Sequence, residues 1–432
     1  MESLYERLAE DDEGRVCRGI PEAACVQSPR AFACTLVANT LSSVADKLAS
    51  AKTTLPWLLM QLGAPAGLLG LLVPIRESGS MLPQMLIGAL VRRQPVRKWV
   101  WVGGGVLQGL CLALMAWVAL VAHGVAAGLA IVALLVVFSL ARGACSVAFK
   151  DVQGKTIPKT RRGRLSGWVS ALAGLAAMAV GGLLGQWQAE AGGSVGIYAG
   201  LLGLAAALWW LASVSYAGII EYPGATEGGA NGWREAWQRL SLLRDDAPFR
   251  RFVMARALAM GSGLAAPFYI AMARDDLGDA VAWLGVFIAV EGLAGLVSSP
   301  IWGRWADRSS RRVFAAASGL AALLSVAVGV SAWWAMPTSV AMVVYPVTLF
   351  LLGVAHAGVR LGRKTYLVDM AEGNQRTDYV AVSNSVIGVV LLATGLLGAL
   401  AATVSVGLTL IVLGLAGAWG AVLALGWREV SG

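Results

Sequence analysis

The chain has 432 residues, of which 57% are hydrophobic and only 14% are charged, and its formal net charge is +9. Soluble domains carry a charge on about 25% of their residues, so this composition excludes a soluble protein and indicates one that lies in a lipid bilayer. No zinc-protease, phosphate-loop or serine-hydrolase motif is present, and two histidines leave little material for imidazole chemistry. We therefore expect no enzymatic activity, no cofactor and no metal site.

Twelve apolar segments follow one another along the chain, each close to the roughly 20 residues that cross the hydrocarbon core. Their apolar runs are continuous, without the alternation of a lipid-facing strand, which favours helices over a barrel. The sequence thus predicts an all-α integral membrane protein with twelve transmembrane helices. The expected spans are residues 33–57, 64–90, 99–122, 124–140, 165–187, 195–220, 252–273, 280–301, 313–335, 339–359, 380–403 and 408–427.

The basic residues predict the orientation of these spans. Of the 34 Lys and Arg residues, 23 lie in five clusters that separate pairs of spans, and only Arg274 lies in an alternate gap. Because Lys and Arg beside a span resist translocation, the clusters mark the cytosolic side and place both termini there. Attraction to anionic lipid accounts for the positive charge, so we expect no nucleic-acid partner. The clusters occupy residues 92–98, 150–164, 234–251, 304–312 and 360–376.

The two halves of the chain repeat each other. Residues 88–98 (GALVRRQPVRK) and 303–313 (GRWADRSSRRV) each end an even-numbered span, and they begin 215 positions apart. The next cytosolic gaps begin near Asp151 and Asp369, which are 218 positions apart. A parallel repeat of this kind is one of the architectures that transporters use for alternating access. We expect a cytosolic tail at 1–30, a six-helix half at 31–220, a cytosolic linker at 221–250 and a second six-helix half at 251–432.

In this organisation the chain resembles the major facilitator superfamily of secondary transporters. The hallmark of that family lies between the second and third spans of each half and reads roughly Gly-x-x-x-Asp-Arg-x-Gly-Arg-Arg. Ser310 stands in the second copy where a glycine is usual. The matching positions of that copy are Gly303, Asp307, Arg308, Arg311 and Arg312.

The first copy of the hallmark departs from the pattern. It keeps Gly88, Arg93 and Arg97 but has Arg92 at the usual Asp position. The resemblance implies a conformational latch, in which loop charges pair with charges at neighbouring helix ends in the outward-open state and separate in the inward-open state. Since Arg92 inverts the usual polarity, we hypothesise that it pairs with Asp151. The alternative is that basic residues such as Arg97 and Lys98 only set the orientation.

Four charged residues lie at one depth in the first two spans. An unpaired charge at the bilayer centre costs about 2.5–3.5 kcal/mol, so such residues usually pair, face a cavity or mark a pathway. Asp46 and Lys47 lie past the middle of span one, and Arg76 and Glu77 lie at a similar depth in span two. The simplest arrangement pairs Asp46 with Arg76 or Lys47 with Glu77. These residues are candidates for substrate binding or coupling, and a structural clamp between the two helices is the alternative.

Two further polar positions are candidates for the transport pathway. Glu291 lies at mid-depth in span eight, which contains no basic residue, and it is our candidate for proton coupling. The alternative is a protonated carboxyl group that bonds across a helix contact. Pro74 and Pro83 predict a kink in span two, which would free backbone carbonyls and expose Gln84 to a solute.

The remaining basic residues within spans bear on the charge of the solute. Those nearest the cytosolic ends are expected to extend toward the interface, as Lys and Arg often do; they are Arg142, Arg256, His356 and Arg360. Lys52 lies deeper and is expected to line the exit. Basic residues outnumber the three acids within the spans, which favours an anionic or zwitterionic solute; the basic set is Lys47, Lys52, Arg76, Arg142 and Arg256.

The function that the sequence favours is a proton-coupled secondary transporter of a small polar solute in a bacterial inner membrane, acting as a monomer. Its partners are the solute, protons and lipid. An exporter of amphiphilic compounds is an alternative that predicts an apolar cavity. A receptor or assembly subunit with a transporter fold is another, in which the buried charges serve only as clamps.

Overall fold

The structure is a computed structural model that describes residues 25–82, 87, 90–91, 93–186, 195–224, 226, 240–306, 308–334, 336–370 and 375–430. The expectations for the tail before residue 25, for most of the linker and for Gln84, Gly88, Arg92 and Asp307 therefore lie outside the described residues. Every regular element in the described part is helical. An all-helical chain suits a membrane, because each helix satisfies its own backbone hydrogen bonds where no water is present.

The described helices fall into two sets along the chain. The first set consists of α3 (Ser28–Leu48), α4 (Thr54–Gln61), the 3₁₀ turn η1 (Ala66–Leu68), α5 (Leu69–Met81), α7 (Lys98–Val121), α8 (Gly124–Thr156), α9 (Lys159–Gln186) and α10 (Val195–Ala217). The second set consists of α12 (Leu242–Asp245), α13 (Ala247–Leu258), α14 (Gly261–Leu264), α15 (Ala266–Leu277), α16 (Val281–Ala306), α17 (Ser310–Ser331), α18 (Thr338–Met370), α19 (Gln375–Val404) and α20 (Val406–Leu425).

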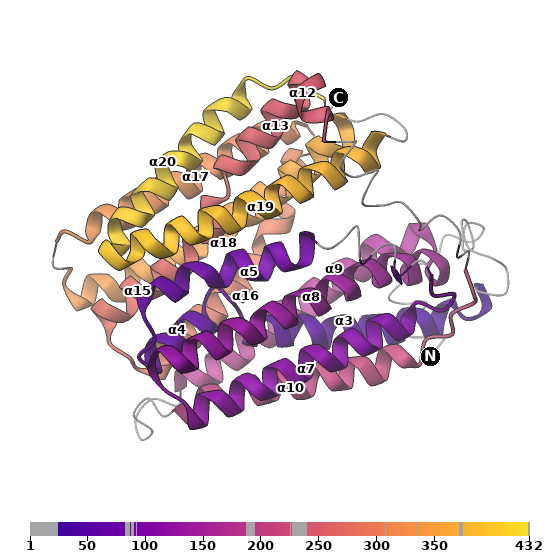
Figure 1. Ribbon diagram of the computed structural model, residues 1–432, viewed down its shortest axis with the longest axis horizontal. Helices are drawn as coiled ribbons and strands as arrows, with labels where there is room; N and C mark the ends of the chain where they lie inside the picture. Colours follow the sequence, from indigo (N-terminus) through magenta and orange to yellow (C-terminus); the bar gives the residue numbers. More distant parts are fainter. Residues whose placement is uncertain are drawn as a thin grey trace.

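Figure 1 shows the long helices running roughly side by side, with α7 and α10 at one edge of the molecule and α17 and α20 at the opposite edge. The start of α3, the short helix α12 and the end of α20 lie at the same end of the helices, which we call the termini side. The opposite end, where α4 and α15 lie, is the far side. The helices of the two sets meet toward the far side and diverge toward the termini side.

Within the described residues, ten helical segments are long and apolar enough to cross a membrane, and they correspond to expected spans three to twelve. Span one is present but divided: it consists of α3 and α4, separated by residues 49–53. Span two begins with η1 and α5, and most of its remainder lies outside the described residues. Pro74, one of the two prolines at which we expect a kink, lies inside the helix α5. The predicted all-α architecture is thus confirmed, with a break that apolar patterning does not reveal.

Span seven is interrupted at the position equivalent to the break in span one. Here α13 ends at Leu258, α14 covers Gly261–Leu264, and α15 begins with a proline in its first turn. Proline lacks a backbone donor, so a helix tolerates it best at the start of a new segment. The first helix of each half is therefore discontinuous near its middle, a feature that transporters use to bring backbone groups to a binding site.

Two helices extend beyond their expected spans on the termini side. Both α8 and α18, the fourth spans of the two halves, contain 33 residues. At about 1.5 Å per residue such a helix is about 50 Å long, whereas the hydrocarbon core is about 30 Å thick. Both helices therefore continue past the expected span ends at residues 140 and 359, through charged residues that follow the apolar run.

Glycines allow the two sets of helices to approach closely on the far side. A Cβ atom at Gly181 of α9 would lie 2.4 Å from the carbonyl oxygen of Gly285 on α16, and one at Gly285 would lie 2.5 Å from the carbonyl oxygen of Gly181. Nearer the termini side of α9, a Cβ at Gly163 or Gly167 would meet nothing within 4 Å. Small residues of this kind permit backbone contact between membrane helices. The contact between α9 and α16 is thus tight from the far side to Gly174 and Gly292, where a Cβ at Gly292 would lie 2.9 Å from the carbonyl oxygen of Gly174, and it loosens toward the termini side.

Candidate functional site

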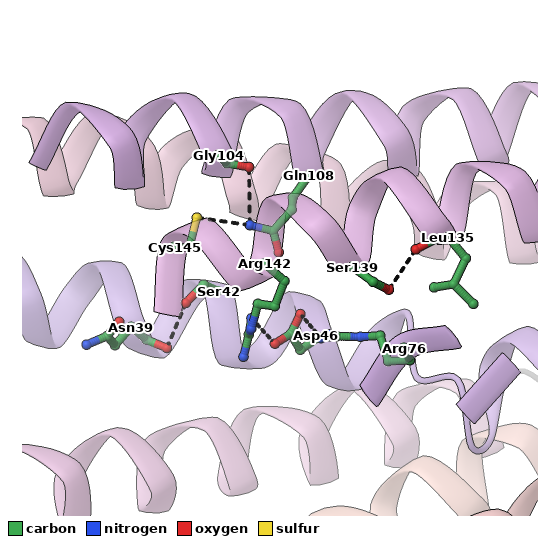
Figure 2. Close-up of polar contacts among 10 residues, drawn as sticks. All are labelled: Asn39, Ser42, Asp46, Arg76, Gly104, Gln108, Leu135, Ser139, Arg142 and Cys145. Atoms are coloured by element: carbon green, nitrogen blue, oxygen red, sulfur yellow. Dashed lines mark hydrogen bonds and ion pairs between the residues drawn. The ribbon is translucent and has the colours of Figure 1, made fainter. Parts of the chain in front are cut away.

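Asp46 lies between two arginines contributed by two other helices (Figure 2). One guanidinium nitrogen of Arg76, on α5, lies 3.2 Å from Asp46 Oδ1, and Arg142, on α8, forms an ion pair with Asp46 Oδ2. The Asp46 side chain is 15% exposed. Charge-assisted hydrogen bonds to both carboxylate oxygens compensate for removing these groups from water. The cluster, which we call the Asp46 triad, joins α3, α5 and α8.

Aromatic rings cover the two arginines of the triad. The Arg76 guanidinium carbon lies 4.9 Å from the centre of the Phe138 ring, and that of Arg142 lies 5.6 Å from the centre of the Trp209 ring. Such cation–π contacts stabilise a guanidinium that has lost part of its hydration. They also fix the direction in which each arginine reaches the carboxylate.

The structure contains one of the two ion pairs that the shared depth of the charges predicts. Asp46 pairs with Arg76, whereas no ion pair joins Lys47 to Glu77 in the described part of the chain. Lys47 points elsewhere: a Cβ at Gly295 of α16 would lie 3.6 Å from its Nζ. Successive helical residues point about 100° apart, so Asp46 and Lys47 face different neighbours. The expectation that Arg142 extends to the interface was wrong, because α8 continues well past it.

The break in span one contacts Glu291 of α16. Ser50 Oγ and Thr53 Oγ1 both donate hydrogen bonds to Glu291 Oε2, each at 3.2 Å. The hydroxyl oxygen of Ser50 also accepts a bond from the backbone N–H of Lys52 at 3.2 Å. Within the break, side-chain bonds thus take over part of the role of helical backbone bonds. Glu291 joins the two halves, since α3 and α4 belong to the first and α16 to the second.

A cavity lies between the halves next to this break. It is partly open, and its empty space of about 550 Å³ includes solvent at the opening. The first half contributes Lys52 from the break, together with Val73, Glu77 and Met81 from α5. The charged and titratable residues that the second half contributes are Arg256, His356, Arg360 and Arg363.

Hydrogen bonds hold two of the cavity residues in place. The guanidinium of Arg256, which is only 4% exposed, donates to Ser383 Oγ at 2.6 Å and to Asn384 Oδ1 at 2.9 Å. His356 Nδ1 lies 3.3 Å from Ser262 Oγ. Both contacts involve neutral partners. The cation Arg256 is therefore positioned without being neutralised.

The cavity corrects several expectations about the buried charges. Arg256, His356 and Arg360 line it instead of extending to the interface. Of the predicted candidates, Glu77 lines it, whereas Asp46 and Arg76 pair outside it. Sequence reasoning missed Arg363, which it placed in a cytosolic cluster. The signal that could have found it is the i, i+3 spacing of Arg360 and Arg363, which puts both side chains on one face of a helix.

Glu221 clamps the loop before α7 to the end of α10. Its carboxylate accepts the backbone N–H groups of Arg97 at 3.1 Å and Lys98 at 2.6 Å, and Lys155 Nζ lies 3.0 Å from it. Asp151 forms ion pairs with Arg97 and, at 2.7 Å, with Lys155. Arg97 therefore has a specific partner and does more than set orientation.

The second half contains a matching clamp. Glu429, just after α20, accepts a bond from Ser309 Oγ at 2.7 Å and lies 3.4 Å from Arg311 Nε. Arg311 also donates to the carbonyl oxygen of Trp427 at 2.7 Å. In each half, a carboxylate after the last helix thus holds the loop that precedes the third span.

The remaining latch candidates make fewer contacts. Asp151 pairs with Arg97 and Lys155, and the hypothesis that it pairs with Arg92 stays a prediction, because Arg92 lies outside the described residues. Gly303 has open space around its α-carbon. Four latch residues are exposed and form no ion pair within the described part of the chain; they are Arg93, Arg308, Arg312 and Asp369.

Arg274 joins the halves on the far side. From the end of α15 it donates to Gln61 Oε1 at 2.6 Å and to the carbonyl oxygen of Trp57 at 3.3 Å, both on α4. Its guanidinium carbon lies 5.7 Å from the Trp57 ring centre. The indole N–H of Trp57 in turn donates to Tyr198 Oη at 2.8 Å. The basic residue that stood apart in the charge pattern is thus a contact that closes the far side.

We expect Arg274→Gln to open the far side. A hydrogen bond to a charged group contributes about 1.5–3 kcal/mol, so the substitution should shift the population toward far-side opening by about tenfold or more. Spin labels at Val121 and Asp279, in a background without native cysteines, would report the distance across the far side. The exposed Asp275→Asn is the matched control. Equal distance distributions in the two variants would show that Arg274 does not hold the halves together.

Solved structures share this fold at low sequence identity. A D-xylose–proton symporter is 13% identical, with a TM-score of 0.71 over 93% of this chain and 98% of its own. The xylose transporter XylE from E. coli in an inward-open conformation is 12% identical, with a TM-score of 0.70 over 93% and 97%. A POT family transporter in complex with 5-aminolevulinic acid is 12% identical, with a TM-score of 0.70 over 95% and 98%. At such identities the likeness shows the fold alone.

The sequence comparisons give the family. No curated protein matches the chain in sequence. A family model described as the Major Facilitator Superfamily matches residues 35–344, which is more than half of the chain and extends from α3 into α18. The fold, with a discontinuous first helix in each half and a cavity between the halves, agrees with that match. The chain therefore belongs to the Major Facilitator Superfamily.

Proposed function

We propose that this chain is a proton-coupled secondary transporter that moves a small anionic or zwitterionic solute across a bacterial inner membrane by alternating access. The observation that carries the proposal is the cavity between the halves, which both halves line and which brings together four cations, Lys52, Arg256, Arg360 and Arg363, with one acid, Glu77. An amphiphilic compound would require a mostly apolar cavity. Apolar residues also contribute to this lining, but its four cations with a single acid favour an anionic solute over the drug-exporter alternative.

The arrangement of the halves supports alternating access. Glycine contacts and Arg274 close the far side, while the helices diverge toward the termini side. With both termini in the cytoplasm, as the basic clusters indicate, this conformation is open to the cytoplasm. Opening the far side would then require the contacts of Arg274 to break, while the clamps at Glu221 and Glu429 lie within each half and can persist in both states.

Glu291 supports proton coupling. As a carboxylate it accepts two hydroxyl bonds from the break in span one. A protonated carboxyl group carries a donor in place of one acceptor site, so protonation would change the contact between the halves. A proton on Glu291 would thus favour one arrangement of the halves over another, which is the requirement for coupling.

Proton movement in proteoliposomes with a trapped pH dye tests the proposal. Pools of small carboxylates, phosphates and amino acids, followed by amphiphilic drugs, would be added to wild type and to Glu291→Gln. We expect a solute-dependent proton signal in wild type that the variant loses. Glutamine keeps a carbonyl acceptor for Ser50 and Thr53, so the variant should retain solute counterflow, the exchange of labelled for unlabelled solute without net proton movement.

Two outcomes would contradict this expectation. A proton signal that persists in Glu291→Gln would assign coupling to another group. The absence of both proton signal and counterflow with every pool, from folded wild-type protein, would favour the non-transporting alternative, in which the buried charges only clamp helices.

A further inference from the structure

The charge of the cavity lining narrows the class of solute. Lys52, Arg256, Arg360 and Arg363 bring four positive charges and Glu77 brings one negative charge, so the lining carries a net charge of +3 with His356 neutral. Uncompensated charge within a membrane protein is costly, and it usually marks a site where an ion of opposite sign binds. The lining therefore requires negative charge from a source other than its own side chains.

The other acids of the membrane region are already engaged. Asp46 is bound by Arg76 and Arg142, and Glu291 accepts bonds from the break in span one. Neither residue lines the cavity. Glu291 acts electrostatically on Lys52, but in the described lining Glu77 is the only acid beside Arg360 and Arg363, so the arginine side of the cavity keeps an excess of positive charge.

The cations of the cavity lack anionic partners. Lys52, Arg360 and Arg363 form no ion pair and no side-chain hydrogen bond within the described part of the chain. Arg256 is buried and bound only by neutral groups, and its Nε has no hydrogen-bond partner among the described residues. These donors are thus available to a ligand.

The donors come from both halves. Lys52 belongs to the break in span one, whereas Arg360 and Arg363 lie one turn apart on the same face of α18. Paired guanidinium groups suit a carboxylate or phosphate group, whereas a lysine amine acts as a single point charge. A solute with two negative groups can contact the donors of both halves at once.

We propose that the solute is a small anion with at least two negatively charged groups, such as carboxylates or phosphates. Arg360 and Arg363 hold one group, and Lys52 holds another across the cavity. The inference rests on the proposed function for its site and names the solute class of that site. Binding of such a dianion draws the two halves together, because its charges are shared between them.

A matched ligand series tests the inference without knowledge of the natural solute. Succinate, its half-amide and its diamide have similar shapes and carry two, one and no negative charges. Glycerol 3-phosphate and glycerol form a second series, which separates phosphate from carboxylate recognition. Thermal unfolding of the purified full chain at constant ionic strength would report binding. We expect at least one dianion to bind at least tenfold more tightly than its less charged analogues.

Variants assign the binding to the named residues. We expect Lys52→Gln and Arg363→Gln each to weaken dianion binding by tenfold or more, and Arg363→Lys, which retains the charge, to restore part of it. Arg304→Gln removes an exposed charge outside the cavity and should leave binding unchanged. The rescue by lysine separates loss of charge from loss of folding.

Other outcomes would overturn the inference. Equal stabilisation by the diamide and succinate, or no stabilisation by any dianion of the series, would remove the requirement for two negative charges. Proton-coupled uptake of a zwitterionic or neutral solute would also overturn it, while leaving the proposed transporter function intact. Absence of counterflow with every solute would instead contradict the proposed function itself.

Discussion

Asp46→Asn is expected to unfold this protein at a markedly lower temperature than wild type. The substitution leaves Arg76 and Arg142 without their shared carboxylate in a site where the Asp46 side chain is 15% exposed. Removing one partner of a buried ion pair costs about 3–5 kcal/mol, because the remaining charge stays unpaired. Thermal unfolding in detergent would measure the loss, with the exposed Asp245→Asn as the matched control.

A second substitution distinguishes the effect of unpaired arginine charges from a nonspecific loss of stability. In Asp46→Asn with Arg142→Gln, one unpaired cation has been removed, so part of the stability should return. Arg142→Gln alone retains the Asp46–Arg76 pair and should be milder than Asp46→Asn. If the double variant were as unstable as the sum of the single variants, the triad would not be an electrostatic unit.

Gly285→Val is expected to prevent the close contact between α9 and α16. Its Cβ would lie 2.5 Å from the carbonyl oxygen of Gly181 and 2.7 Å from the backbone nitrogen of Gly185, and backbone atoms cannot move aside as a flexible side chain can. Overpacking typically costs about 1–3 kcal/mol, and here the cost falls only on states in which the far side is closed. Spin labels at Val121 and Asp279 should therefore report a larger far-side distance.

The matched control for this substitution is Gly182→Val. Gly182 lies beside Gly181 on α9, yet a Cβ there would meet nothing within 4 Å. Helix propensity changes in the same way at both sites, so any difference between the variants reflects packing. An unchanged far-side distance in Gly285→Val would mean that the helices adjust without separating.

Sequence reasoning predicted the features that depend on the length of each apolar segment and on the depth of each charged residue in the membrane. The spans, the all-α fold and the Asp46–Arg76 pair follow from these two quantities. The depth of a residue in the membrane does not give the direction in which its side chain leaves the helix. Depth alone therefore could not show that Lys47 faces Gly295 instead of Glu77. The roles of these residues in binding and coupling stay predictions.

The sequence also did not locate the end of α18 or the break in span one. Arg360 was expected at the cytosolic end of its span and Arg363 in the cluster beyond it, because the apolar run ends there, although α18 continues past both. The break at residues 49–53 contains Lys52 and two hydroxyl residues, but polar residues also lie elsewhere in span one, so hydropathy alone does not distinguish the break from a continuous helix. Ser50 and Thr53 became visible as partners of Glu291 only through the structure.

The net positive charge of the cavity lining also makes the conformational equilibrium of the protein depend on the membrane potential. Moving one elementary charge through the field costs or releases about 2.3 kcal/mol per 100 mV. An empty cavity with a net charge of +3 is therefore drawn toward the negative, cytoplasmic side in the proposed orientation. A bound dianion cancels most of that charge, so voltage acts strongly on the empty protein and only weakly on the loaded one.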